Sequence, residues 1–123
     1  MIVKFSERGS VMEILEKKEQ EVLIFGLKGE IMGGPETEKF HKRLYDAVKQ
    51  GDVNVIIDMS QATWMNSSGL GMLISGLTTL RSSGGDLRLA CLSPRLKRPL
   101  EITKLDSVFS MYDTIASALE SFK

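Results

Sequence analysis

The sequence DMSQATWMNSSGLG, residues 58–71, joins an apolar run to a helical pattern and organises the rest of the chain. Residues 53–57 before it are rich in Val and Ile, which is typical of a buried strand. After it, apolar residues recur with the spacing of one helix face, at Leu70, Leu73, Ile74, Leu77 and Leu80. Asn66, Ser67 and Ser68 lie between, and Asn and Ser favour helix N-caps because their oxygens accept hydrogen bonds from free backbone N–H groups. The stretch predicts strand, loop and helix start, with Ser67 and Ser68 exposed in the first turn or its cap.

Two hydroxyl groups at a helix N-terminus indicate a place suited to an anion. Free backbone donors and the positive end of the helix dipole converge there. A phosphate attached to one of the hydroxyls would meet the same field. We therefore take this turn as the candidate functional site.

The composition is that of an ordinary soluble domain. The 123 residues fit one domain, residues 1–123, with 42% hydrophobic and 26% charged residues. Sixteen basic and sixteen acidic residues balance, which argues against a nucleic-acid partner. The single cysteine excludes a disulfide scaffold within the chain, and no apolar run approaches the ~18 residues of a membrane span. The N-terminus has no signal-peptide pattern, so we expect a cytoplasmic protein without a membrane partner.

The pattern before the central stretch predicts a β-hairpin and then a helix. Residues 11–18 and 21–27 predict two strands, with the charged residues 17–21 as their turn. Residues 1–10 either add a short edge strand or fray. Pro35, followed by two acids, starts a helix that ends near Gly51.

The pattern after the central helix predicts two more strands and two more helices: a strand over residues 86–92, a helix from residue 93, a strand over residues 108–112 and a final helix capped by Asp113. Pro99 implies that the helix after residue 93 either begins later, near Lys97, or kinks. The order predicts an α/β fold with a mixed, mostly parallel sheet of about five strands, helices in βα order and an antiparallel first strand at its edge.

Few residues favour catalysis. His41 is the only histidine and is expected on a helix surface, and Cys91 is expected as a buried structural thiol. Zinc-cluster, nucleophile-elbow and phosphate-loop patterns are missing from the sequence. The patterns thus predict no enzyme, no cofactor and no metal. The alternative is a small-molecule or nucleotide-binding protein that uses the crevice at the helix start, residues 66–71.

Other polar and apolar groups each have two interpretations. Trp64 and Met65 are either core residues or exposed apolar residues of a protein interface. The turn of Gly33 and Gly34 either leads into the helix or approaches a phosphate. Three basic residues are either a solvated helix face or a small anion-binding patch, namely Arg95, Lys97 and Arg98.

A family resemblance covers about residues 20–120. Residues 66–71, NSSGLG, following DMS, resemble the D-S-S-G-L-G signature of the STAS domain, above all in the small stand-alone anti-sigma factor antagonists of bacteria. Residues 27–31 resemble the family's L-x-G-E-I segment, residues 84–87 its G-G-x-L, and residues 100–109 its L-x-x-x-x-L…F region. The resemblance implies a STAS-like fold over the whole chain.

The resemblance also implies a non-enzymatic switch that regulates transcription. In family members the first serine of the pair is phosphorylated by an anti-sigma factor with serine kinase activity, and a PP2C-type phosphatase removes the phosphate. By motif position that serine is Ser67. The unphosphorylated form binds the kinase and thereby frees the sigma factor.

The parallel topology predicts the contact surface, because the carboxyl ends of neighbouring strands lie at one edge of a sheet. We expect the surface around Ser67 to comprise Asn66, Ser68, Gly69, Met65, Trp64, Gly33 and Gly34, the last two from a loop that spans residues 31–34 and borders the surface. The sequence departs from the family pattern in two places. Asn66 replaces the usual acid before the serine pair, and Met32 follows the G-E-I segment where many members have Asp. Both departures remove negative charge around Ser67.

Overall fold

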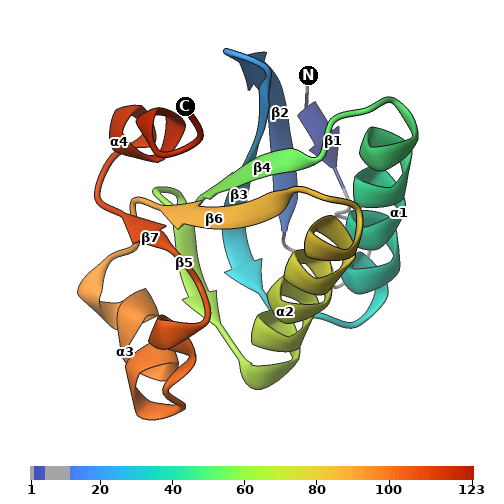
Figure 1. Ribbon diagram of the computed structural model, residues 1–123. Helices are drawn as coiled ribbons and strands as arrows, with labels where there is room; N and C mark the ends of the chain where they lie inside the picture. The colour runs from blue at the N-terminus through green and yellow to red at the C-terminus, as the bar shows by residue number, and fades with distance from the viewer. Residues whose placement is uncertain (1, 5–11) are drawn as a thin grey trace.

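The computed structural model describes residues 2–4 and 12–123, which form one sheet covered by helices (Figure 1). The strands are β1 (Ile2–Lys4), β2 (Glu13–Glu19), β3 (Val22–Ile31), β4 (Asn54–Asp58), β5 (Ala62–Met65), β6 (Asp86–Ala90) and β7 (Met111–Tyr112). The helices are α1 (Pro35–Lys49), α2 (Ser67–Ser82), α3 (Pro94–Ile102) and α4 (Ile115–Glu120), with a 3-10 turn at Leu105–Ser107. The remainder of the predicted segment 1–10 lies outside the described residues.

The sheet is mixed and mostly parallel, as the sequence predicts. Its order is β1-β2-β3-β4-β6-β7, and β5 pairs with β3 beside this path. The pairs β1–β2 and β2–β3 are antiparallel, and the other four are parallel. The first strand of the predicted hairpin, β2, is antiparallel as expected but does not lie at the edge, because β1, within the segment for which an edge strand or fraying was left open, pairs with its other side. The sheet has seven strands rather than about five, because β1 and the short β5 add to it.

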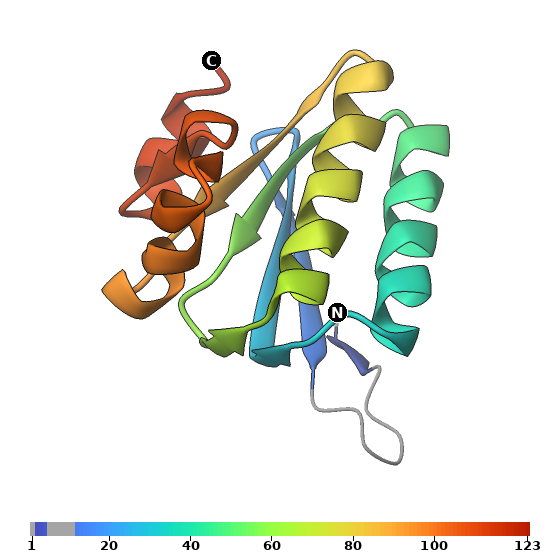
Figure 2. The same ribbon diagram turned by 90° about the horizontal axis from the view of Figure 1, so that it is seen from below.

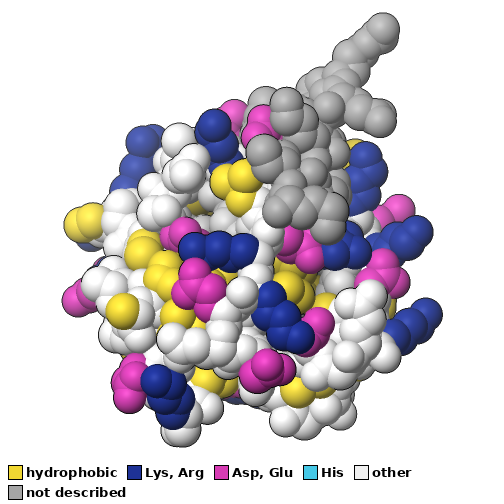
Figure 3. All heavy atoms as spheres, turned by 90° about the horizontal axis from the view of Figure 1, so that it is seen from above, with side chains coloured by type: hydrophobic (Ala, Val, Ile, Leu, Met, Phe, Trp, Pro, Cys, Tyr) yellow, Lys and Arg dark blue, Asp and Glu magenta, His cyan; other side chains and the backbone are white. Residues whose placement is uncertain are grey.

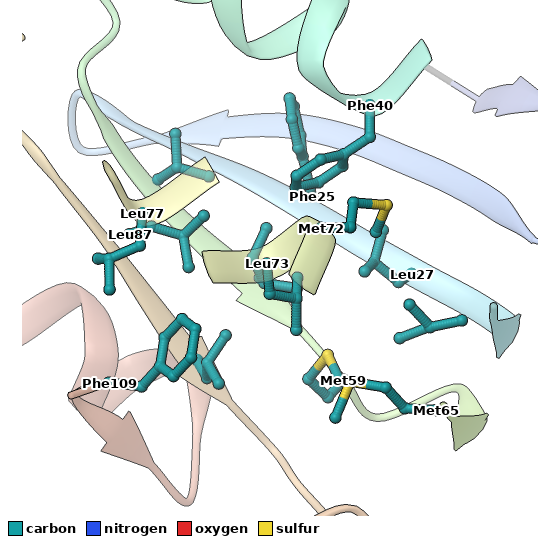
Figure 4. Packing of buried hydrophobic residues seen from close by; sticks show 14 of the residues in the cluster. Phe25, Leu27, Phe40, Met59, Met65, Met72, Leu73, Leu77, Leu87 and Phe109 are labelled. Atoms are coloured by element: carbon teal, nitrogen blue, oxygen red, sulfur yellow. The ribbon is translucent and has the colours of Figure 1, made fainter. Parts of the chain in front are cut away.

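Side chains alternate along the strands, so each face of the sheet carries buried apolar residues. Phe25 and Leu27 of β3 point to the face covered by α1, α2 and α3, where Phe25 meets Phe40 of α1 edge-on with ring centroids 6.1 Å apart. Figure 2 shows α1 and α2 side by side in front of the sheet, and Figure 4 shows how their side chains meet those of β3. Most of the core lies on this face.

A smaller cluster covers part of the opposite face. Ile24 of β3 and Ile56 of β4 pack there against Ala118 and Leu119 of α4. The guanidinium of Arg88 lies 3.9 Å from the centre of the Phe122 ring. Helix α4 contacts β4, β6 and β7, and β2 is not among the strands with which it makes extensive contact. Part of this face over β2 and β3 is therefore left open by the helix.

The predicted hairpin turn was wrong at its start. Residues 17–19 continue β2 instead of turning, and the reversal is confined to Gln20 and Glu21, whose φ angles are 52° and 67°. Lys18 pairs across to Asp52 at 2.9 Å, which holds part of the charged run in the strand. β3 also continues to Ile31, past the predicted end of its strand.

In the C-terminal third, the predicted start of α3 at Ser93 and Pro94 is confirmed, and two other details differ from expectation. Helix α3 begins at Pro94 with Ser93 as its cap and keeps Pro99 inside it, so it does not begin near Lys97. The strand expected over residues 108–112 is reduced to Met111–Tyr112, because the 3-10 turn continues into Val108, whose N–H donates to Leu105 O. Thr114, not Asp113, caps α4: its Oγ1 accepts from Ser117 N at 3.0 Å.

Candidate functional site

The short strand β5 positions the start of α2. Gly29 N donates to Gln61 O at 3.0 Å, and Asn66 N donates to Ile31 O at 3.2 Å, so the chain entering α2 is held against the end of β3. Sequence reasoning missed β5, although Thr63 and Trp64 are residues that favour strands. Its four residues follow a turn and are stabilised by pairing with β3, which local pattern does not reveal.

The N-terminus of α2 is capped by Asn66. Its backbone is extended, with φ −98° and ψ 179°, and its Oδ1 accepts from Gly69 N at 2.8 Å. Such a cap contributes about 1 kcal/mol to stability. Ser67 is the first helical residue and Ser68 the second, and both are exposed. The predicted placement of the two serines is thus confirmed.

The first turn of α2 lies unusually close to the end of β3. A Cβ placed on Gly69 would lie 2.1 Å from Ile31 O, so only glycine fits there. A Cβ on Gly33 would lie 2.7 Å from the Cβ of Ser68, and Gly33 has φ +74°. Gly34, at φ +69°, is the N-cap residue of α1. The loop 31–34 and the serine turn therefore form one continuous structure.

The predicted contact residues divide by exposure. Ser67, Ser68, Gly34 and Trp64 are exposed, the side chain of Asn66 is half-buried, and Met65, Gly69 and Gly33 are buried. Met65 is 5% exposed and points into the core with Met59 and Leu73, so its side chain does not contribute to the surface (Figure 4).

Two large apolar side chains remain on the surface at the strand ends that support the serine turn. Trp64 is 40% exposed on β5, and Met32 is 38% exposed in the loop after β3. Glu30 and Ile31 of β3 pair in parallel with Trp64 and Met65 of β5. Trp64 and Met32 therefore lie at the same end of two neighbouring strands. Met32 belongs to the loop that was predicted to border the contact surface. The sequence pattern, however, assigns the contact to Gly33 and Gly34 of that loop and not to Met32.

The serine turn is electrically neutral apart from its helix end. No residue from 59 to 80 carries a formal charge. The first turn of α2 contains no acidic residue. A phosphate on Ser67 would consequently meet the positive helix end without a neighbouring carboxylate in the same segment.

Other groups give little support to catalysis. His41 is half-buried, with Nε2 3.4 Å from Met72 O. Burial, and then the charge of Asp58, raises the pKa of the half-buried Cys91 thiol, the opposite of nucleophile activation. Among residues 2–4 and 12–123, no three His, Cys, Asp or Glu side chains are grouped to hold a metal. Lys97 of the basic stretch lies 3.6 Å from Asp113.

None of the helices in the described ranges has the length and apolar character needed to cross a membrane. Two cavities of the structure lie away from the α2 N-terminus, one against β2, β3 and the end of β4 and the other along α1.

Comparisons with known proteins agree with the geometry. The family model of the STAS domain matches residues 13–118. A protein of Thermotoga neapolitana named "Putative anti-sigma factor antagonist TM1081 homolog" is 33% identical over 82 residues, 66% of this chain and 73% of its own. The anti-sigma-B factor antagonist of Listeria monocytogenes is 38% identical over 64 residues, 52% of this chain and 55% of its own.

Solved structures show the same likeness. The crystal structure of a protein of Thermotoga maritima, named as a putative anti-sigma factor antagonist, superimposes with a TM-score of 0.80 at 27% identity. The superposition covers 88% of this chain and 92% of the other. The arrangement of sheet and helices described above is therefore shared along nearly the whole length of both chains.

Proposed function

Because the chain belongs to the STAS domain family, we propose that it is an anti-sigma factor antagonist that uses the start of α2 as its binding surface. The observation that carries the proposal is the exposed hydroxyl of Ser67 at a capped helix N-terminus braced against β3. The names of the relatives supply the class of partner, an anti-sigma factor. A protein that acts on transcription in this way works in the cytoplasm.

The proposed switch is reversible phosphorylation of Ser67. An anti-sigma factor with serine kinase activity transfers the phosphate, and a PP2C-type phosphatase removes it. Ser67 is preferred over Ser68 because it is the first residue of α2, whereas the loop lies close to Ser68: a Cβ built on Gly33 would lie 2.7 Å from the Cβ of Ser68. The chain itself performs no chemistry in this scheme and serves as substrate and ligand.

Trp64 and Met32 are the proposed apolar anchors of the interface. Aromatic side chains at interfaces often contribute a large share of the binding energy. Both are partly exposed beside an uncharged turn, so a partner would desolvate them at little polar cost. Gly33, Gly34 and Gly69 shape the surface, because residues without a side chain let the loop 31–34 and the start of α2 pack closely together.

Trp64→Ala is expected to weaken binding of the anti-sigma factor at least tenfold, about 1.4 kcal/mol, because it removes one anchor. Titration calorimetry with the purified anti-sigma factor measures the effect. Ile102→Ala is the matched control, since Ile102 is 68% exposed on α3, outside the proposed surface. Equal losses in both variants would refute the assignment of this surface.

Phosphorylation itself is tested by the intact mass of the protein purified from its native cell. We expect a fraction heavier by one phosphate group, and peptide mapping that places the group on Ser67. Treatment with a PP2C-type phosphatase should return that fraction to the unmodified mass. A phosphate mapped only to residues outside the α2 start would contradict the proposal.

A further inference from the structure

A hollow over Gly26 lies on the face of the sheet opposite α1 and α2. Its volume is about 370 Å³. It is lined by Leu15, Glu16, Lys17, Ile24, Gly26, Asp58, Ser60 and Gln61. Figure 3 views the molecule from above, the side on which β2, β4 and α4 lie in Figure 1, and apolar atoms are visible there between charged side chains. The hollow is separate from the Ser67 site and has no part in the function proposed above.

Gly26 keeps this hollow open. It stands inside the ten-residue strand β3 without a positive φ, so its backbone does not require glycine. A Cβ at this position would meet Leu15 Cβ at 3.5 Å, an ordinary contact. Glycine inside a strand lowers stability and often marks a place where a ligand or another backbone approaches closely. The missing side chain leaves space above the floor formed by Leu15 and Ile24.

The charges around the hollow are unequal. Lys17 Nζ lies 3.0 Å from Glu19 Oε1, which neutralises that cation. The carboxylate of Glu16 is bound by Arg43 of α1 on the other face, with Arg43 Nε 3.0 Å from Oε2. Asp58 stands at the end of β4, and its Oδ1 accepts from Ser60 N at 3.0 Å. Among the charged side chains that line the hollow, the Asp58 carboxylate is the one without an ion pair to another described residue.

We propose that this hollow binds a small organic molecule that carries an amine or amidine group on an apolar body. The cationic group would donate to Asp58, and the apolar body would lie over Gly26 against Leu15 and Ile24. Ser60 and Gln61 at the rim offer further polar contacts. The volume falls in the range of about 300–1,000 Å³ typical of ligand pockets. At about 30 Å³ per non-hydrogen atom, the density of water, it holds roughly a dozen such atoms.

The test is a titration of ¹⁵N-labelled protein with benzamidine, and with benzyl alcohol as the uncharged probe of similar size. We expect saturable benzamidine shifts at the amides of Gly26, Asp58 and Gln61, with at least tenfold weaker binding of benzyl alcohol. Gly26→Val, which fills the hollow, should weaken benzamidine binding at least tenfold. Asp58→Asn keeps the oxygen that accepts from Ser60 and should abolish the preference for the charged probe.

Thermal unfolding of both variants accompanies the titration. Gly26→Val is expected to fold as well as the unchanged protein, because valine favours strands and its Cβ has room. If Gly26→Val does not fold, the proposal is tested by Asp58→Asn alone, which should lose the preference for benzamidine over benzyl alcohol. Absence of saturable shifts around the hollow, or unchanged binding in every variant that folds, would overturn the proposal. Shifts confined to the Ser67 turn would also overturn it.

Discussion

Gly69→Ala is expected to destabilise the domain by about 3 kcal/mol, the upper range for an overpacked core position. The added methyl group would lie 2.1 Å from Ile31 O, and the nearby atoms belong largely to the backbone of β3, which cannot yield as a flexible side chain does. Helix α2 would have to move away from β3. That movement would strain the bond that Asn66 N donates to Ile31 O and the cap in which Gly69 N donates to Asn66 Oδ1.

Gly71→Ala is the matched control for this prediction. Gly71 lies two residues further along the same helix, and a Cβ there meets nothing within 4 Å. Alanine should therefore stabilise the helix by about 0.5–1 kcal/mol, the usual difference from glycine in a helix. Urea unfolding followed by circular dichroism measures both. Similar free energies of unfolding for the two variants would show that the close contact between α2 and β3 is not tight in solution.

Ser67→Asp is expected to weaken binding of the anti-sigma factor at least tenfold while leaving the thermal stability close to that of the unchanged protein. A negative charge at an exposed helix N-terminus is favourable by about 0.3–1 kcal/mol, so the fold is not weakened. In the interface the same charge must be desolvated and repels acidic groups, which costs several kcal/mol for a full phosphate. Each ~1.4 kcal/mol lowers affinity tenfold.

Ser67→Ala should keep the affinity and prevent phosphorylation, since the hydroxyl is exposed and Asn66 supplies the cap. Ser68→Ala is the matched control: it removes the adjacent hydroxyl and should leave phosphorylation by the kinase intact. Incorporation of phosphate from ATP, measured by mass, separates the two variants. Phosphorylation that persists in Ser67→Ala and disappears in Ser68→Ala would move the switch to Ser68.

The start of α2 could be predicted from sequence because its determinants are local. Asn66 caps the turn that follows it within three residues, and the apolar stripe from Leu70 onward belongs to one helix. The order of strands and helices was likewise recoverable, because alternating patterns imply a parallel sheet. The mixed, mostly parallel sheet that results is observed, with β5 as a strand that the pattern did not predict.

The supports of the site could not be predicted, because they depend on contacts between distant residues. Strand β5 has four residues and exists through pairing with β3. Neighbouring residues of a strand point to opposite faces, but this applies to Trp64 and Met65 only once β5 is recognised as a strand. The sequence alone therefore did not show that Trp64 is exposed and Met65 is buried. The need for glycine at position 69 comes from Ile31 O, which lies far away in sequence. Thr114 and Asp113 are adjacent, and both residue types cap helices, so pattern did not separate them.

The proposed switch is tested most directly by the affinity of one protein sample in two states. The protein phosphorylated on Ser67, and the same sample after treatment with a PP2C-type phosphatase, are titrated with the anti-sigma factor in a calorimeter. We expect at least a tenfold lower affinity for the phosphorylated state, restored by the phosphatase. Equal affinities in the two states would contradict it.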